Sequence, residues 1–250
     1  MKALWIFVFS FVFAVFLNQL QAQNESFLGL TLGAALPQGS FAQNDFGNPE
    51  AGYAKTGFLF TFDGALFPDD YLGFGATVTY GSNNPDKQQY KKDLISDLLE
   101  RHPDLEQYED DIYFDYGVWR YLNFHAGPNF TFNANRFNFD LRAMAGLSLA
   151  WSPDQLLQIK INDEETFSRK IDEKAVPTLG YTLGAGIRYS LSSGYTFRFI
   201  VEYSNCKPTY DVVESFDIDG DGNLDIESKE VSTPFKNIQI GIGIAYNFEI

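Results

Sequence analysis

The side chains best suited to chemistry lie in an acidic run near the C-terminal end of the chain. Oxygen-bearing residues occupy alternate positions of this run, namely Asp217, Asp219, Asp221, Asn223 and Asp225. This spacing, with Gly222 at the sixth position where the chain must turn sharply, matches the start of a calcium-binding loop. The twelfth position holds Ser228 instead of glutamate, and no helix pair is predicted around it. Two interpretations stay open: a weak Ca²⁺ site, or a solvated acidic turn.

Residues for catalysis are scarce. The chain has two histidines, His102 and His125, and one cysteine, Cys206. His125 falls on the polar side of an alternating segment, where Asp140 could lie nearby, but no nucleophile can be assigned to this pair. A structural histidine is therefore favoured over a catalytic base. A single cysteine forms no internal disulfide, and the place of Cys206 near the end of a strand allows a free surface thiol.

The charge of the chain limits its partners. The formal net charge is −15 at pH 7. Nucleic-acid binding needs clustered Lys and Arg, so a nucleic-acid partner is excluded and divalent cations are the natural counter-ions. No zinc-ligand spacing, phosphate loop or dinucleotide motif occurs. We predict no catalytic and no cofactor-binding residue, with Ca²⁺ as the one candidate ligand.

The first 22 residues have the pattern of a signal peptide. Lys2 is followed by an apolar run from Leu4 to Leu17, and a cleavage site is predicted after Ala22. The predicted division is therefore a signal peptide over 1–22 and one mature domain over 23–250.

The elements that would position these side chains are strands with one apolar and one polar or small face. The last is the most regular: every second residue from Ile238 to Phe248 is a large apolar one. Eight such segments are predicted, at about 27–36, 53–65, 71–82, 121–132, 137–151, 178–191, 195–204 and 237–248.

Connections between these strands alternate between long and short. The long ones cover about 37–52, 83–111, 152–177 and 205–234. Apolar residues at helical spacing predict a short helix over 87–100, ended by Pro103. We expect its apolar stripe to pack against the barrel rim or a neighbouring loop; the alternative is binding of a partner.

Together these features predict an all-β fold, an eight-stranded antiparallel up-and-down transmembrane β-barrel with a short helix in one extracellular loop. The strands of a soluble lipocalin-like barrel also alternate between apolar and polar residues, but their apolar face is turned inward. The membrane form is favoured because the polar face is rich in Gly, Ala, Ser and Thr, which suits a cramped lumen. Aromatic residues near the strand ends match interfacial girdles.

A membrane barrel would place several charged residues in its lumen. They are Lys55, Arg142, Arg188, Arg198, Asp63, Asp140 and Glu202. Opposite charges can satisfy one another by pairing there. The favoured interpretation is a polar plug that closes the barrel, because eight strands leave room mainly for side chains. The alternative is a narrow selective conduit.

The predicted mature chain resembles the PorT-like eight-stranded outer-membrane barrels of Bacteroidetes-type bacteria and, more distantly, the OmpA and OmpX barrels. The resemblance is carried by the segments FLGLTLGAAL, GYAKTGFLFTFDGALFPDDYLGFGATVTYGS and IQIGIGIAYNF. It implies a fold and an outer-membrane location, and scarcely any activity. No peptidoglycan-binding domain is expected after the last strand.

The predicted function is that of a non-enzymatic, monomeric outer-membrane barrel. Its long acidic loops would be extracellular and both termini periplasmic, for surface interaction or envelope stability. The expected partners are outer-membrane lipid and an extracellular protein or glycan. The alternatives are a narrow pore or small-solute conduit and an envelope lipid-modifying enzyme.

Overall fold

The computed structural model describes residues 26–68, 71–101, 103, 112–160, 166–191, 194–217 and 225–249. The predicted signal peptide over 1–22 and His102 lie outside the described residues.

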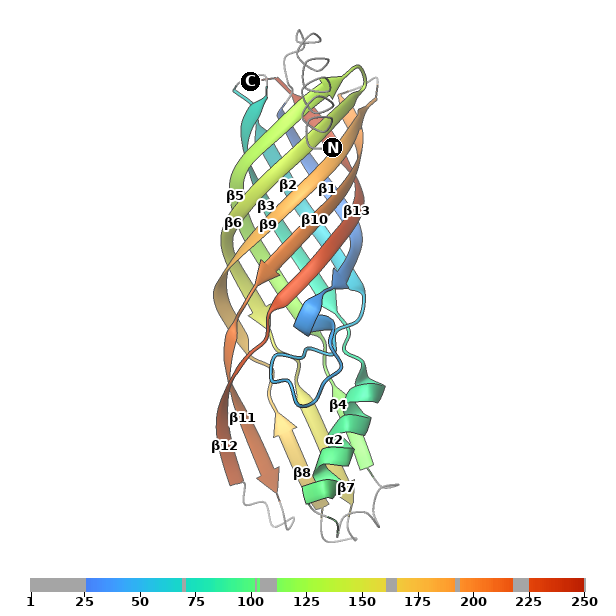
Figure 1. The fold of residues 1–250 in the computed structure, drawn as a ribbon. Coiled ribbons are helices and arrows are strands. Elements are labelled where there is room, and N and C mark those ends of the chain that lie inside the picture. The colour runs from blue at the N-terminus through green and yellow to red at the C-terminus, as the bar shows by residue number, and fades with distance from the viewer. Residues whose placement is uncertain are drawn as a thin grey trace, which may run out of the picture.

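Eight strands form a closed antiparallel barrel in which each barrel strand pairs with the next along the chain (Figure 1). They are β1 Ser26–Pro37, β2 Gly57–Leu66, β3 Leu72–Asn83, β5 Trp119–Ala134, β6 Phe137–Trp151, β9 Ala175–Ser190, β10 Tyr195–Cys206 and β13 Phe235–Phe248. The barrel closes where β1 pairs with β13, with Leu30 opposite Ile244. The predicted eight-stranded up-and-down barrel is confirmed.

One predicted strand begins too early. The sequence predicted a start near Tyr53, whereas β2 begins at Gly57. Tyr53 has a backbone φ of 50°, a left-handed conformation that interrupts an extended chain. Its hydroxyl donates a hydrogen bond to Asp93, so this segment is held by the outer part of the molecule.

The alternation of apolar and polar residues predicted from the sequence separates side chains on the outer surface of the barrel from those in the lumen. On β13, Ile242 and Ile244 are more than half exposed on the outer surface, whereas Asn237 and Gln239 are buried in the lumen. Because successive side chains point to opposite faces, a slip of one residue would exchange these two sets. The long apolar runs therefore fix the register. No helix among the described residues has the length and apolar character needed to cross a membrane.

Three of the four long connections are more regular than the sequence predicted. They contribute a second, five-stranded sheet in the order β12-β11-β8-β7-β4, which we call the outer sheet. Its strands are β4 Ile112–Tyr116, β7 Gln155–Lys160, β8 Thr166–Ile171, β11 Thr209–Asp217 and β12 Asp225–Ser232. Figure 1 shows this sheet beyond the barrel end opposite the termini. These strands have five to nine residues, too few for their alternation to stand out among charged residues.

The predicted helix is confirmed as α2, Lys87–Arg101, and lies against the outer sheet. Its Leu94, Ile95 and Leu98 are buried with three residues of the sheet, Ile112, Leu157 and Ile159. The expectation that this stripe packs on a neighbouring loop is therefore confirmed. A short 3-10 helix, η1 Gly39–Ala42, comes from the first long connection and buries Phe41.

Candidate functional site: the lumen and the outer sheet

The lumen near the termini holds a network of buried ion pairs. Asp63 of β2 accepts two hydrogen bonds from Arg198 of β10, Nη1 to Oδ1 at 2.7 Å and Nη2 to Oδ2 at 2.8 Å. Arg142 of β6 joins the same carboxylate to Glu202 of β10. All four side chains are almost fully buried. The network therefore ties β2, β6 and β10 together across the barrel.

A second buried pair lies beside this network. Arg188 donates from Nε to Asp140 Oδ2 at 2.7 Å and from Nη2 to Asp140 Oδ1 at 2.9 Å. The guanidinium carbons of Arg188 and Arg198 lie 4.3 Å and 5.2 Å from the ring centroid of Phe27. Because a ring face attracts cations, Phe27 holds two arginines that are direct neighbours on β9 and β10. The sequence did not single out Phe27, since its neighbours in the alternating pattern look equally apolar.

Six of the seven charges predicted for the lumen are found there, three arginines against three carboxylates. Lys55 is the exception. It precedes β2, its side chain is 59% exposed, and its Nζ lies 2.9 Å from Asp86 Oδ2. The prediction placed it in the lumen by extending the alternation too far toward Tyr53. The described charges inside the barrel are therefore balanced in number.

A layer of histidine and hydroxyl side chains lies farther from the termini. The imidazole of His125 is hydrogen-bonded through Nδ1 to Thr182 Oγ1 at 3.0 Å and through Nε2 to Ser148 Oγ at 3.1 Å. It is 2% exposed, and Asp140, its suggested neighbour, is bound to Arg188 instead. Both ring nitrogens are thus occupied by hydroxyl groups inside a closed wall. A buried histidine with both ring nitrogens hydrogen-bonded fits the structural role that the sequence favoured.

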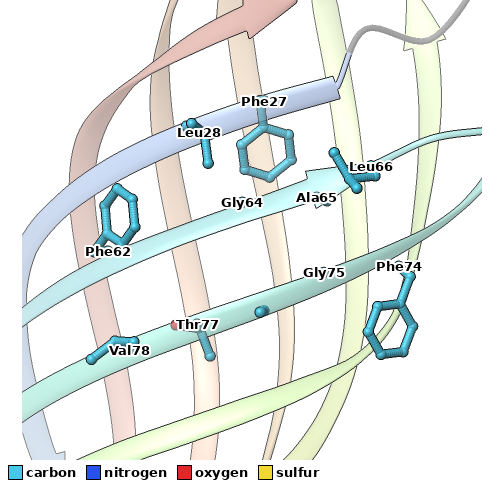
Figure 2. Close-up of a pocket in the computed structure, with 11 residues that line it drawn as sticks. Phe27, Leu28, Phe62, Gly64, Ala65, Leu66, Phe74, Gly75, Thr77 and Val78 are labelled. Atoms are coloured by element: carbon cyan, nitrogen blue, oxygen red, sulfur yellow. The ribbon is translucent and has the colours of Figure 1, made fainter. Parts of the chain in front are cut away.

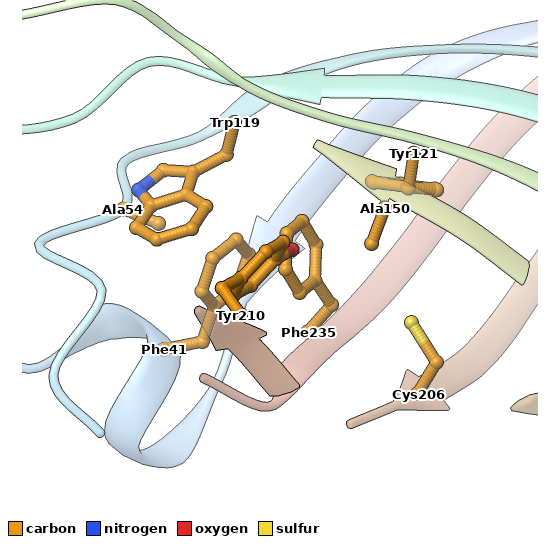
Figure 3. Packing of buried hydrophobic residues seen from close by; sticks show 8 residues of the cluster. All are labelled: Phe41, Ala54, Trp119, Tyr121, Ala150, Cys206, Tyr210 and Phe235. Atoms are coloured by element: carbon orange, nitrogen blue, oxygen red, sulfur yellow. The ribbon is translucent and has the colours of Figure 1, made fainter. Parts of the chain in front are cut away.

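Aromatic side chains pack together at the barrel mouth next to the outer sheet, in a group that we call the mouth cluster (Figure 3). It consists of Phe41, Ala54, Trp119, Tyr121, Ala150, Cys206, Tyr210 and Phe235. The rings of Phe41 and Phe235 stack at 4.8 Å, and Trp119 meets both edge-on. The indole Nε1 of Trp119 donates to the carbonyl of Gly52 at 2.8 Å. Aromatic pairs of this geometry add stability beyond the area that they bury.

The mouth cluster was not predicted from the sequence. Phe41, Trp119 and Phe235 lie at strand ends or in loops, where an aromatic residue also fits an interfacial girdle. Cys206 belongs to this cluster and is 5% exposed, so the expectation of a surface thiol is wrong. Its side chain faces inward because Cys206 continues the inward-facing series of β10, after Ser204.

The proposed calcium loop falls between β11 and β12 in the sequence. Phe216 pairs with Asp225 at the last described rung, so Asp217 and Asp225 flank the residues between the two strands. Asp219, Asp221 and Asn223 lie outside the described residues, as do the side chains of Asp217 and Asp225. Within the described part, no three acidic, histidine or cysteine side chains form a metal-binding group. The calcium prediction therefore stays a prediction.

Buried tyrosines fix the outer sheet to α2. Burial raises the pKa of the Tyr53 hydroxyl, and its hydrogen bond to Asp93 raises that pKa further. Burial also raises the pKa of Tyr116 well above its ordinary value. Tyr90 of α2 stands between them, with ring centroids at 5.0 Å and 4.6 Å. The hydroxyls of Tyr53 and Tyr116 are therefore neutral at physiological pH. The contact with α2 is a packing of aromatic rings that carry uncharged hydroxyl groups.

The closed antiparallel barrel, its apolar exterior and its polar interior define a membrane-spanning β-barrel. The sequence matches the model of the outer membrane protein beta-barrel domain over residues 8–248. The chain therefore belongs to the outer membrane protein beta-barrel domain family, and its location is the outer membrane.

Solved structures of outer-membrane barrels are similar to this chain. A major outer membrane protein from Thermus thermophilus has 15% identity and a TM-score of 0.47, over 90% of this chain and 100% of that chain. Ail, the attachment invasion locus protein of Yersinia pestis, has 13% identity and a TM-score of 0.43, over 91% and 100%. Neisserial surface protein A has 9% identity and a TM-score of 0.42, over 91% and 100%. No curated protein matches the chain.

Proposed function

We propose that this protein is a non-enzymatic, monomeric outer-membrane barrel that carries the outer sheet as a rigid platform for surface interaction. The fold supports this because the strands of the barrel lead directly into those of the outer sheet. For example, only two residues separate β10 from β11. The platform is thus held by the barrel wall. Its expected partner is an extracellular protein or glycan. The alternative role for the same platform is to stabilise the cell envelope.

The single observation that carries this proposal is the filling of the lumen. Ion pairs close the half near the termini, hydroxyl groups surround His125, and the mouth cluster covers the other end. Eight-stranded barrels have interiors that side chains just fill. This favours a plug over the narrow pore or small-solute conduit. The enclosed His125 likewise gives no support to a lipid-modifying enzyme.

Conductance in planar bilayers tests the plug. We expect the folded protein to give no resolved current steps. The matched comparison is a variant that empties the mouth, Phe41→Ala with Trp119→Ala, followed by Arg142→Ala in the same chain. Steps that appear only after all three substitutions would show that these side chains block the lumen. Regular steps from the unaltered protein would contradict the proposal and favour the conduit.

The proposed orientation places both termini in the periplasm and the outer sheet outside. An even number of strands and long connections at one end support it. In a Cys206→Ala background, Ser228→Cys puts a thiol on exposed β12, and Arg136→Cys puts one on the short β5–β6 turn. We expect a membrane-impermeant maleimide to label the first variant in intact cells and the second only after permeabilisation. The reverse pattern would overturn this orientation.

A further inference from the structure

A hollow of about 360 Å³ opens on the outer, apolar surface over β1, β2 and β3 (Figure 2). We call it the wall groove. Its outward-facing lining residues are Leu28, Phe62, Gly64, Leu66, Phe74, Ala76 and Val78. The volume is within the range of small-molecule sites in proteins. The inward-facing Phe27, Ala65, Gly75 and Thr77 also contribute to its lining, but the outward-facing side chains put its opening on the outer surface.

The strand register explains why the surface is hollow here. Gly64 of β2 is the direct partner of Ala76 on β3, and Ala76 is the partner of Ala126 on β5. The flanking row holds large side chains, with Phe62 opposite Val78. The small side chains of the first row rise less far from the sheet than those of the flanking row, which leaves the surface hollow. The side chain of Leu28 lies above Gly64. A Cβ atom added at Gly64 would lie only 2.7 Å from Leu28 Cδ2.

The other wall of the groove is formed near the barrel end that carries the termini. Leu66 and Phe74 are direct partners across β2 and β3, and both are exposed. Figure 2 shows Phe62 and Val78 on one side of Gly64 and Gly75, and Leu66 and Phe74 on the other. Leu66 and Phe74 therefore bound the groove on the side of this barrel end, so the groove lies close to the rim.

We propose that the wall groove binds one acyl chain of a membrane phospholipid. The groove is continuous with the apolar belt that meets the bilayer in this family, so its neighbours are acyl chains. Its lining is almost entirely apolar, which suits a hydrocarbon chain. A chain lodged in it regains dispersion contacts that an open hollow forfeits. The choice of phospholipid rests on the proposed orientation, which puts this rim in the periplasmic, phospholipid leaflet.

Photo-crosslinking tests the groove directly. The full mature protein is folded into vesicles of phosphatidylethanolamine and phosphatidylglycerol that contain a trace of phospholipid with a diazirine in the middle of one acyl chain. After irradiation, adducts are mapped by mass spectrometry. We expect Leu66, Phe74 and Val78 to carry several-fold more adducts than Leu183 and Val201, which face lipid on the opposite wall. Even labelling around the barrel would overturn the proposal.

A matched pair of variants separates this groove from lipid contact in general. Ala76→Phe fills the floor, and Ala185→Phe adds the same ring at an exposed alanine of β9 on the opposite wall. We expect the first to reduce adducts at Phe74 and Val78 several-fold and the second to leave them unchanged. Ala76→Leu serves as a smaller filler if the phenylalanine variant fails to fold. An unchanged adduct map in a folded filler variant would contradict the proposal.

These vesicles contain phospholipid in both leaflets, so the result does not depend on orientation. A failure of the orientation would appear only in the cysteine labelling of intact cells. A failure of the groove would appear only in the adduct map.

Discussion

Arg142 connects two carboxylates from different strands inside the barrel. Its guanidinium contacts Asp63 and Glu202, and Asp63 also binds Arg198. Removing one member of a buried pair leaves an uncompensated charge, whereas exposed pairs contribute little. The stability of the barrel should therefore depend on this residue far more than on surface arginines.

We predict that Arg142→Met lowers the free energy of unfolding by about 3–5 kcal/mol. Urea unfolding of the barrel in phospholipid vesicles measures this change. Arg136→Met, on an exposed turn, is the control and should change the free energy by less than about 1 kcal/mol. Adding Glu202→Met to Arg142→Met should recover part of the loss, because Asp63 keeps Arg198. Equal losses in the two single variants would contradict the network.

The reactivity of the Cys206 thiol tests whether the mouth cluster is tightly packed. It is packed with Tyr121 and Phe235, so a maleimide should not reach it in the folded protein. We predict labelling only after denaturation, measured by the mass of the intact protein. The variant Ser228→Cys in a Cys206→Ala chain should be labelled at once. Rapid labelling of Cys206 in the folded protein would mean that the mouth is open.

At the scale of the element, α2 begins at a side chain that caps it. Asp86 precedes the helix, and its Oδ1 accepts a hydrogen bond from the Gln89 amide at 3.2 Å. Its Oδ2 lies 2.9 Å from Lys55 Nζ. Burial by itself raises the pKa of Asp86, but the hydrogen bonds from Lys55 and Gln89 outweigh it and hold the pKa below its ordinary value. The stability of the first turn of α2 therefore depends on pH.

We predict that Asp86→Ala weakens α2 by about 1 kcal/mol, the usual effect of losing an N-cap. Hydrogen exchange of the α2 backbone amides measures this, with the exposed Glu100→Ala as control. Because the folded pKa is lowered, the stabilisation is complete above about pH 4 and is lost as the pH falls through the folded pKa. Exchange in the unaltered protein should therefore approach that of Asp86→Ala only at acidic pH. Equal protection of both proteins at neutral pH would contradict the cap.

At the scale of the whole molecule, negative charge is concentrated at one end. Residues 209–232 contain eight acidic residues and one lysine, out of a chain with net charge −15. In the β11–β12 register, Asp211 is directly opposite Glu230. Like charges directly opposite one another destabilise a pair of strands. A cation bound at the hairpin tip would reduce this repulsion.

We therefore predict that Ca²⁺ stabilises the hairpin with a dissociation constant of about 10⁻⁴–10⁻³ M. Isothermal titration and thermal unfolding with and without a chelator measure the effect. Asp219→Asn with Asp221→Asn should abolish the heat of binding, whereas Asp172→Asn, an exposed residue after β8, should leave it unchanged. Thermal unfolding that is insensitive to chelation would contradict the calcium proposal.

The sequence by itself determined the eight barrel strands, their inward and outward faces, the helix, and which charges face the lumen, with Lys55 as the exception. These features follow from local periodicity, because a strand shows its two faces every second residue. Only the tertiary structure decided which charges meet. Asp63 and Arg198 are 135 residues apart, and Asp140 binds Arg188 and not His125. The outer sheet and the mouth cluster were also decided there, because short strands and single aromatic residues acquire their partners through register and closure of the barrel.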